Sequence, residues 1–84
     1  MFSVNQQSTT SPQTVSFLRD YWHVVVSVNN DATGGVFVNF DDDATTGNYL
    51  IDPGEKLVYH GSRPLSQMSF LGQGNDAVVS VIAY

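Results

Sequence analysis

The chain reads VFVNF over residues 36–40 and LIDPGEKLVY over residues 50–59. Apolar and polar side chains alternate in both stretches, which is the period-two pattern of a β-strand with one buried face. Within the second stretch, Asp52-Pro53-Gly54-Glu55 has proline at the second turn position and glycine at the third, which suits a type II turn. The pattern predicts short antiparallel strands joined by a tight turn, and no catalytic group stands near them.

The same alternation continues on both sides of this stretch. Val24, Val26 and Val28 fall on one face of an expected strand, and β-branched residues at this spacing fit a pleated, half-buried surface. Segments rich in Gly, Asn, Asp and Pro separate such runs, and no segment of ten or more residues has a helical period. This spacing predicts a small antiparallel β-sandwich or jelly-roll-like domain. We expect strands over residues 15–17, 21–28, 36–40, 49–51, 56–60, 66–71 and 77–84.

Length and composition narrow the classes of protein and partner. The 84 residues are enough for one domain, and the absence of cysteine leaves a partner chain as the usual way to stabilise so small a scaffold. Only three cations stand against eight acidic residues, so we expect neither nucleic acid nor an anionic membrane as a partner. No basic and apolar leader and no apolar run of membrane-spanning length occurs.

The first fourteen residues differ in character from the rest. They are rich in Ser, Thr, Gln and Asn, and Met1, Phe2 and Val4 are their only aliphatic or aromatic side chains. A frayed terminus is the plain interpretation. We instead predict an extended N-terminal arm over residues 1–14, laid on a neighbouring subunit, followed by a β-sandwich domain over residues 15–84.

Three groups of polar residues are candidates for a site of chemistry. The run Asp41–Asp43 offers hard oxygens to Ca²⁺ but lacks the spacing of a calcium loop, so a solvated loop is expected and cation binding is left open. His23 and His60 lie in expected strands without a recognisable nucleophile, which favours strand or interface roles. Asp52 and Glu55 flank the Pro53-Gly54 turn, so we expect Asp52 to hydrogen-bond the turn backbone rather than to form a catalytic carboxylate pair with Glu55. We therefore expect a protein without enzymatic activity, with no catalytic residue, no metal and no cofactor.

Several expected strands are apolar on both faces. Phe37 lies opposite the face of Val36 and Val38, and Val25 lies opposite the face of Val24 and Val26. A thin domain buries one face in its own core, so the other is available to another chain. Exposed Trp and Tyr side chains near Asp and Asn would alternatively form a platform that binds carbohydrate. The expected subunit-interface residues are Phe2, Val4, Tyr21, Trp22, Val25 and Phe37.

The stretch VSVNNDATGGVFVNFDDDATTGNYLIDPGEKLVYHG, residues 26–61, together with QGNDAVVSV, residues 73–81, resembles small structural proteins of tailed-bacteriophage virions. The resemblance covers roughly residues 24–84. It implies a β-sandwich or jelly-roll-like subunit, commonly a trimer, that is attached to a capsid or a tail. It implies no catalytic residues.

The function expected from these observations is structural. We expect a capsid decoration or cement protein on the capsid surface of a virion, which forms a homo-oligomer, with a trimer favoured, and binds the major capsid protein or other virion subunits. The arm would bind by adding a strand to a neighbour's sheet. The alternative is a tail, neck or fibre component whose loops at residues 41–48 and 72–76 bind a receptor. A free small binding module is a third interpretation.

Overall fold

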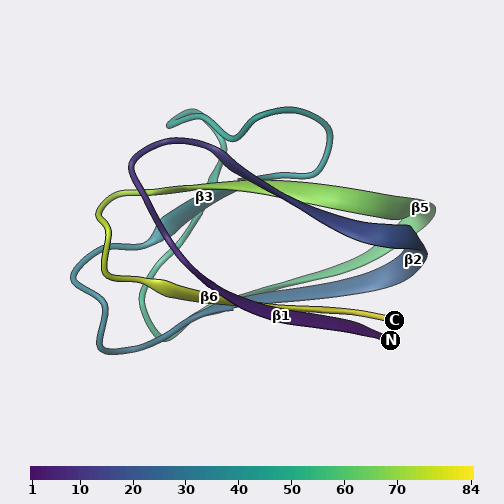
Figure 1. Cartoon of the computed structure of the whole chain (residues 1–84), viewed down its shortest axis with the longest axis horizontal. Helices are drawn as coiled ribbons and strands as arrows, with labels where there is room; N and C mark the ends of the chain where they lie inside the picture. Colours follow the sequence, from purple (N-terminus) through teal and green to yellow (C-terminus); the bar gives the residue numbers. More distant parts are fainter.

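The computed structural model describes residues 1–84, and all of its regular structure is β-strand. The strands form one sheet in the order β1-β6-β2-β5-β3-β4, and every neighbouring pair is antiparallel (Figure 1). The antiparallel all-β prediction is therefore confirmed. The strands are β1 (Phe2–Gln7), β2 (Gln13–Val28), β3 (Val36–Asn39), β4 (Tyr49–Ile51), β5 (Lys56–Gly72) and β6 (Val78–Ala83).

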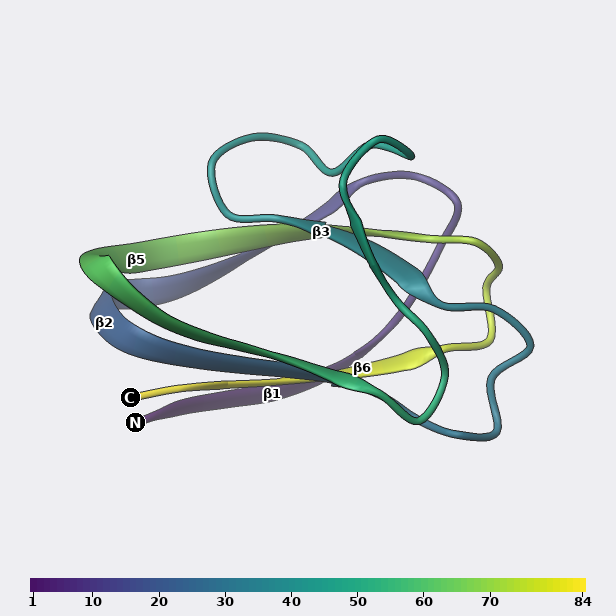
Figure 2. The same ribbon diagram turned by 180° about the vertical axis from the view of Figure 1, so that it is seen from behind.

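The two long strands β2 and β5 bend together and fold the sheet back on itself. Residues 13–16 of β2 pair with 67–70 of β5, residues 23–27 pair with 56–60, and the register shifts between these two segments. Figures 1 and 2 show both strands turning at the same end of the molecule, so that β1 and β6 lie in one layer and β3 in the other. The layers are halves of one continuous sheet, and a sandwich or jelly roll in the sense of separate sheets is not confirmed.

The bend explains where the expected strand boundaries were wrong. Residues 15–17 and 21–28 belong to the single strand β2, whose backbone turns at Leu18 with a φ of 68°. Residues 61–64 were expected to end a strand, yet β5 continues through them. Pro64 is tolerated there because residues 61–64 of β5 have no partner in β2: His60 and Leu65 are the paired residues on either side of them. A backbone N–H at position 64 would therefore have no β2 carbonyl to bond, and proline lacks this N–H without loss.

Residues 1–14 do not form a projecting arm. Strand β1 pairs with the chain's own β6, from Phe2 opposite Ala83 to Gln7 opposite Val78, and β2 already begins at Gln13. Phe2 and Val4 pack against the core, and two apolar side chains at alternate positions are enough to hold an edge strand whose other residues are polar. The prediction failed because this alternation is too sparse to stand out in a polar segment.

The turn at residues 52–55 confirms its prediction. Gly54 has a φ of 83°, and the amide of Glu55 donates to the carbonyl of Asp52 at 3.0 Å, as in a type II turn. The turn joins β4 to β5 and also caps β2, because the Gly54 amide donates to the Val28 carbonyl at 2.9 Å.

The core lies between the two layers. Side chains on a strand alternate between faces, so every second residue of β2, β3 and β6 points inward. The expected inner faces of Val24, Val26 and Val28, and of Val36 and Val38, are buried. The core cluster contains Val15, Phe17, Val24, Val26, Val28, Val36, Val38, Ile51, Leu65, Met68, Phe70, Ala77, Val79, Val81 and Ala83.

Candidate interaction surface

The outer face of the layer formed by β1, β6 and the paired halves of β2 and β5 carries a regular grid of side chains. Val25 pairs with Ile82 on one side and with Val58 on the other, so these three residues form a row across three strands. Val58 is 54% exposed and Ile82 is 39% exposed. We call Ile82, Val25 and Val58 the apolar row. It places exposed valine and isoleucine side chains together on a sheet face that no helix covers.

Two further rows flank the apolar row. On one side, Ser27 pairs with Ser80 and Lys56 and makes a polar row. On the other side, His23 pairs with His60, while its backbone amide and carbonyl bond to the carbonyl and amide of Tyr84 at 3.0 and 2.9 Å. We call Tyr84, His23 and His60 the aromatic row.

The rings of the aromatic row are in contact with one another. The Nδ1 atoms of His23 and His60 lie 2.7 Å apart, and the ring centroids are separated by 4.4 Å. The other side of His23 stacks on Tyr84, with centroids 5.1 Å apart and an angle of 20° between the planes. Two imidazoles this close share one hydrogen bond, in which one ring donates and the other accepts.

The end at which β2 and β5 bend exposes a second set of apolar side chains. Leu18 is 87% exposed and Trp22 is 51% exposed. The Leu18 amide donates to the Ser16 hydroxyl at 3.4 Å, and the guanidinium of Arg19 lies 5.8 Å from the centroid of the Tyr21 ring. This end therefore presents two large apolar side chains; Leu18 is the farther from the apolar row along β2, and Trp22 directly precedes His23 of the aromatic row.

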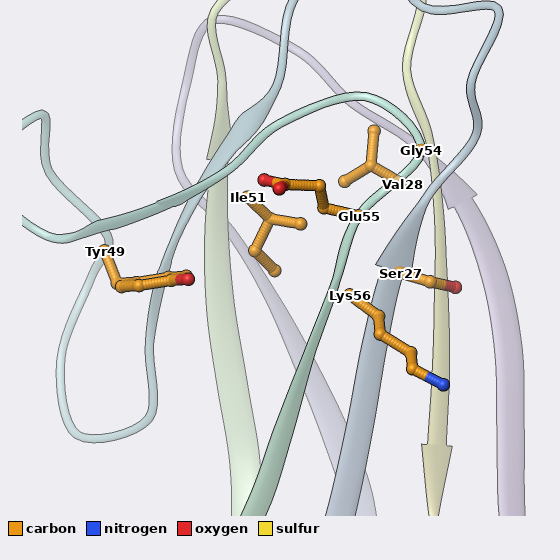
Figure 3. A pocket seen from close by; sticks show the side chains of 7 residues that line it. All are labelled: Ser27, Val28, Tyr49, Ile51, Gly54, Glu55 and Lys56. Carbon is orange, nitrogen blue, oxygen red and sulfur yellow. The ribbon is translucent and has the colours of Figure 1, made fainter.

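A pocket of about 480 Å³ opens between β4, the 52–55 turn and the end of β2 (Figure 3). Ile51 is buried at its wall and Tyr49 is 61% exposed at its edge. In Figure 3 the Lys56 side chain extends away from Glu55, so the two charges are not joined across the pocket. The charges of the pocket wall are thus one carboxylate and one ammonium. The lining residues are Ser27, Val28, Tyr49, Ile51, Gly54, Glu55 and Lys56.

The acidic loop after β3 is organised by its own hydrogen bonds. Asn39 Oδ1 accepts from the amides of Asp41 and Asp42 at 2.8 and 3.2 Å, and the side chain of Asp41 forms an ion pair with Arg63. Asn48 Oδ1 accepts from the Thr45 amide at 2.7 Å. The structure contains no group of three or more His, Cys, Asp or Glu side chains placed to hold a metal ion.

One carboxylate outside this loop is perturbed. The side chain of Asp76 accepts hydrogen bonds from both the amide and the hydroxyl of Thr33, each at 2.9 Å. These bonds stabilise the charged form and hold the pKa of Asp76 below its ordinary value of 3.8. They tie the loop after β2 to the loop before β6, so the role of Asp76 is to join two loops.

The expected interface residues fall into two groups. Phe2, Val4 and Tyr21 are partly buried and pack against the chain's own core, where the rings of Phe2 and Tyr21 lie 5.4 and 6.2 Å from that of Phe17. Trp22 is half exposed at the bend, and Val25 lies at the centre of the apolar row. Phe37 is partly buried, opposite Leu50 and Leu71 in the other layer.

Other members of the surface were not predicted. Val58 and Ile82 stand in alternating runs, but which residues they adjoin depends on the pairing of β5 and β6 with β2. The contact of His23 with His60 depends on the same register.

The comparisons with known proteins identify no family for this chain. No protein-family model, no curated protein and no solved structure matches the chain. No helix in the structure is long and apolar enough to cross a membrane. What can be said of function therefore rests on the residues and their geometry.

Proposed function

We propose that the protein is a non-enzymatic structural subunit of a tailed-phage virion, and that it serves as a capsid decoration or cement protein. In this proposal the outer face of the β1-β6-β2-β5 layer packs against a neighbouring subunit of the capsid. The observation that carries the proposal is the apolar row, in which Val58 is 54% exposed between polar neighbours. Contiguous apolar side chains on a sheet face are typical of a surface that another protein covers.

The size and the border of this face support an interface. A standard protein interface buries about 800 Å² on each partner, and the whole chain exposes 4667 Å², so one face of the domain is large enough. Ser27, Ser80 and Lys56 line one side of the apolar row, which gives an apolar centre with a polar edge.

The mechanism differs from the one expected from the sequence. Strand β1 pairs with β6 of its own chain along one edge, so residues 1–14 do not extend as a free arm that could enter a neighbour's sheet. We therefore assign the contact to the sheet face rather than to an arm. The virion context, the capsid-surface location and the trimeric state follow from the resemblance to phage structural proteins and are parts of this proposal.

Co-sedimentation with capsids of the parent phage tests the proposal. Wild-type protein should co-sediment with capsids that lack it, and Val58→Glu should abolish co-sedimentation because it buries a charge in the contact. Leu18→Glu is the matched control, since it places the same charge on another exposed apolar side chain, at the bend. Both side chains are exposed, so both variants should remain folded.

Three results would count against it. Loss of binding in Leu18→Glu with retention in Val58→Glu would move the contact to the bend. Co-sedimentation with tails and not with capsids would favour the tail, neck or fibre alternative. A wild-type protein that binds neither particle at any concentration would overturn a virion role. Sedimentation equilibrium of the free 9.2 kDa chain separately tests whether it forms a trimer.

A further inference from the structure

The two histidines of the chain, His23 and His60, meet across β2 and β5. Their Nδ1 atoms lie 2.7 Å apart, and the ring centroids are farther apart, at 4.4 Å. The rings therefore approach each other through their Nδ1 edges. A neutral imidazole nitrogen is a common metal ligand in proteins, so this arrangement places two such nitrogens side by side on an exposed strand pair.

From this geometry we infer that His23 and His60 form a two-histidine site for a divalent transition-metal ion, with Cu²⁺ bound most tightly. Metal–imidazole bonds are about 2.0–2.1 Å long, so two neighbouring ligands at a right angle are about 2.8–3.0 Å apart. A tetrahedral site would separate them by about 3.3–3.4 Å. The observed separation of 2.7 Å is that of the hydrogen bond between the rings, so the pair needs to open by only a few tenths of an ångström to hold a metal at a right angle. Square-planar and tetragonal nitrogen sites are typical of Cu²⁺ and Ni²⁺, and Cu²⁺ binds most strongly in the divalent series.

The backbone and a neighbouring ring hold the pair in place. His23 is opposite His60 in the β2–β5 register and is bonded through its amide and carbonyl to Tyr84. The Tyr84 ring stacks on His23 at 5.1 Å, opposite the side that faces His60. Tyr84 thus acts as a positioning residue that limits rotation of the His23 ring. A ligand that is already oriented loses less conformational freedom when the metal binds.

The site supplies two protein ligands. No third His, Cys, Asp or Glu side chain lies with them to complete a metal centre, so water fills the remaining positions. Binding replaces the hydrogen bond between the Nδ1 atoms, because both nitrogens must present lone pairs to the metal. The ring that donated this bond takes the tautomer with its proton on Nε2, so both imidazoles bind as neutral ligands. This property is separate from capsid binding and does not depend on it.

Calorimetric titration of the untagged, full-length chain with Cu²⁺ at pH 7.5 tests the inference. Wild-type protein should bind one Cu²⁺ per chain at least tenfold more tightly than His23→Gln or His60→Gln. The double variant H23Q/H60Q measures the background from the terminal amine and backbone. Each single variant should lie close to that background, because one imidazole alone makes no chelate. A single variant with wild-type affinity would overturn the inference.

Pulsed electron paramagnetic resonance of the Cu²⁺-loaded protein gives an independent readout. The wild type should show two equivalent imidazole nitrogens, and a signal from one or none would contradict the site. Tyr84→Leu should still show two nitrogens but bind severalfold more weakly, whereas unchanged affinity would remove the positioning role of Tyr84. Thermal unfolding checks folding, since Cu²⁺ should raise the midpoint of the wild type and leave that of H23Q/H60Q unchanged.

Discussion

The ring of Tyr59 lies across the backbone of Gly61, two residues further along β5. A Cβ atom on residue 61 would overlap Cζ and the hydroxyl oxygen of this ring. The hydroxyl reaches past the glycine and donates to the carbonyl of Arg63 at 2.9 Å. Glycine at 61 therefore lets one aromatic side chain cover the strand where it bends, and the hydrogen bond fixes the bend at its far side. An aromatic ring that covers a strand glycine is a recognised way to stabilise curved sheets.

Gly61→Ala should displace the Tyr59 ring and break its bond to Arg63, lowering the free energy of unfolding by about 1–2 kcal/mol. Urea denaturation measures the change. Gly47→Ala is the control, because its nearest neighbour outside the adjacent residues would be Thr45 Oγ1 at 3.7 Å. Equal midpoints for the two variants would contradict the packing of Tyr59 on Gly61.

Gly35→Ala should have the larger effect of the glycine substitutions, at about 2–3 kcal/mol. Its Cβ would overlap the carbonyl oxygen of Ile51, which is a backbone atom of the β3–β4 pair and cannot rotate away. The same denaturation experiment measures it, with Gly74→Ala as a control whose Cβ would meet nothing closer than Asp76 Oδ1 at 3.6 Å. The prediction fails if Gly35→Ala unfolds at the wild-type midpoint.

Leu18→Gly should stabilise the protein by about 0.5–1 kcal/mol. A left-handed φ costs a residue with a side chain about 1–2 kcal/mol, and replacement by glycine removes this cost. Glycine also gives the unfolded chain more conformational freedom, which lowers the stability by about 0.4–1 kcal/mol and offsets part of the gain. Little burial is lost, because Leu18 is 87% exposed. Leu18→Val keeps an apolar side chain but adds a branch at Cβ, so its denaturation midpoint should fall. A midpoint that falls for both variants would show that the side chain matters more than the φ angle.

The Asp76 carboxylate should contribute stability in neutral but not in strongly acidic solution. Its folded-state pKa lies below the ordinary 3.8, so the unfolded chain takes up the proton first as the pH falls. The contribution is complete above about pH 4 and is lost as the pH falls through the folded-state pKa. The difference in thermal midpoint between wild type and Asp76→Asn should therefore be constant at pH 5–7 and shrink below pH 4.

A matched experiment separates this bond from general acid effects. Thr33→Val removes the hydroxyl donor but keeps the amide donor, so the pH-dependent difference caused by Asp76→Asn should be smaller in a Thr33→Val background. A difference that keeps its full size at pH 3 in the wild-type background would assign the effect to something other than ionisation of Asp76.

The parts of the fold that the sequence predicted are those with a dense period of two. Val24, Val26 and Val28 repeat without interruption, and the Pro53-Gly54 pair identifies its turn by the φ angles that these residues favour. Strand β1 was missed because Phe2 and Val4 are its only large apolar side chains. The bend in β2 was missed because nothing in the residue type of Leu18 indicates its left-handed φ. The bend in β5 was missed because Pro64 is typical of a strand end, whereas here the strand continues and is merely unpaired with β2 at that point.

Of the residues in the apolar row, the sequence predicted only the one that alternation within its own strand identifies. Val25 was identified because it faces away from Val24 and Val26 within its own run. Its neighbours Val58 and Ile82 lie more than thirty residues further along the chain, and their contact with it depends on a register that no local pattern encodes. The approach of His23 to His60 has the same origin, so alternation alone leaves each histidine as an isolated strand residue.

The position of β6 between β1 and β2 has a consequence for how the chain acquires its fold. Phe2 pairs with Ala83, so the sheet is completed by joining residues from nearly opposite ends of the sequence. During synthesis β1 has no partner until residues 78–83 have left the ribosome, and until then the inner faces of β2 and β5 lack their cover. Topologies built from such distant contacts fold slowly, on the order of milliseconds to seconds, which leaves the newly made chain dependent on β6 to escape aggregation.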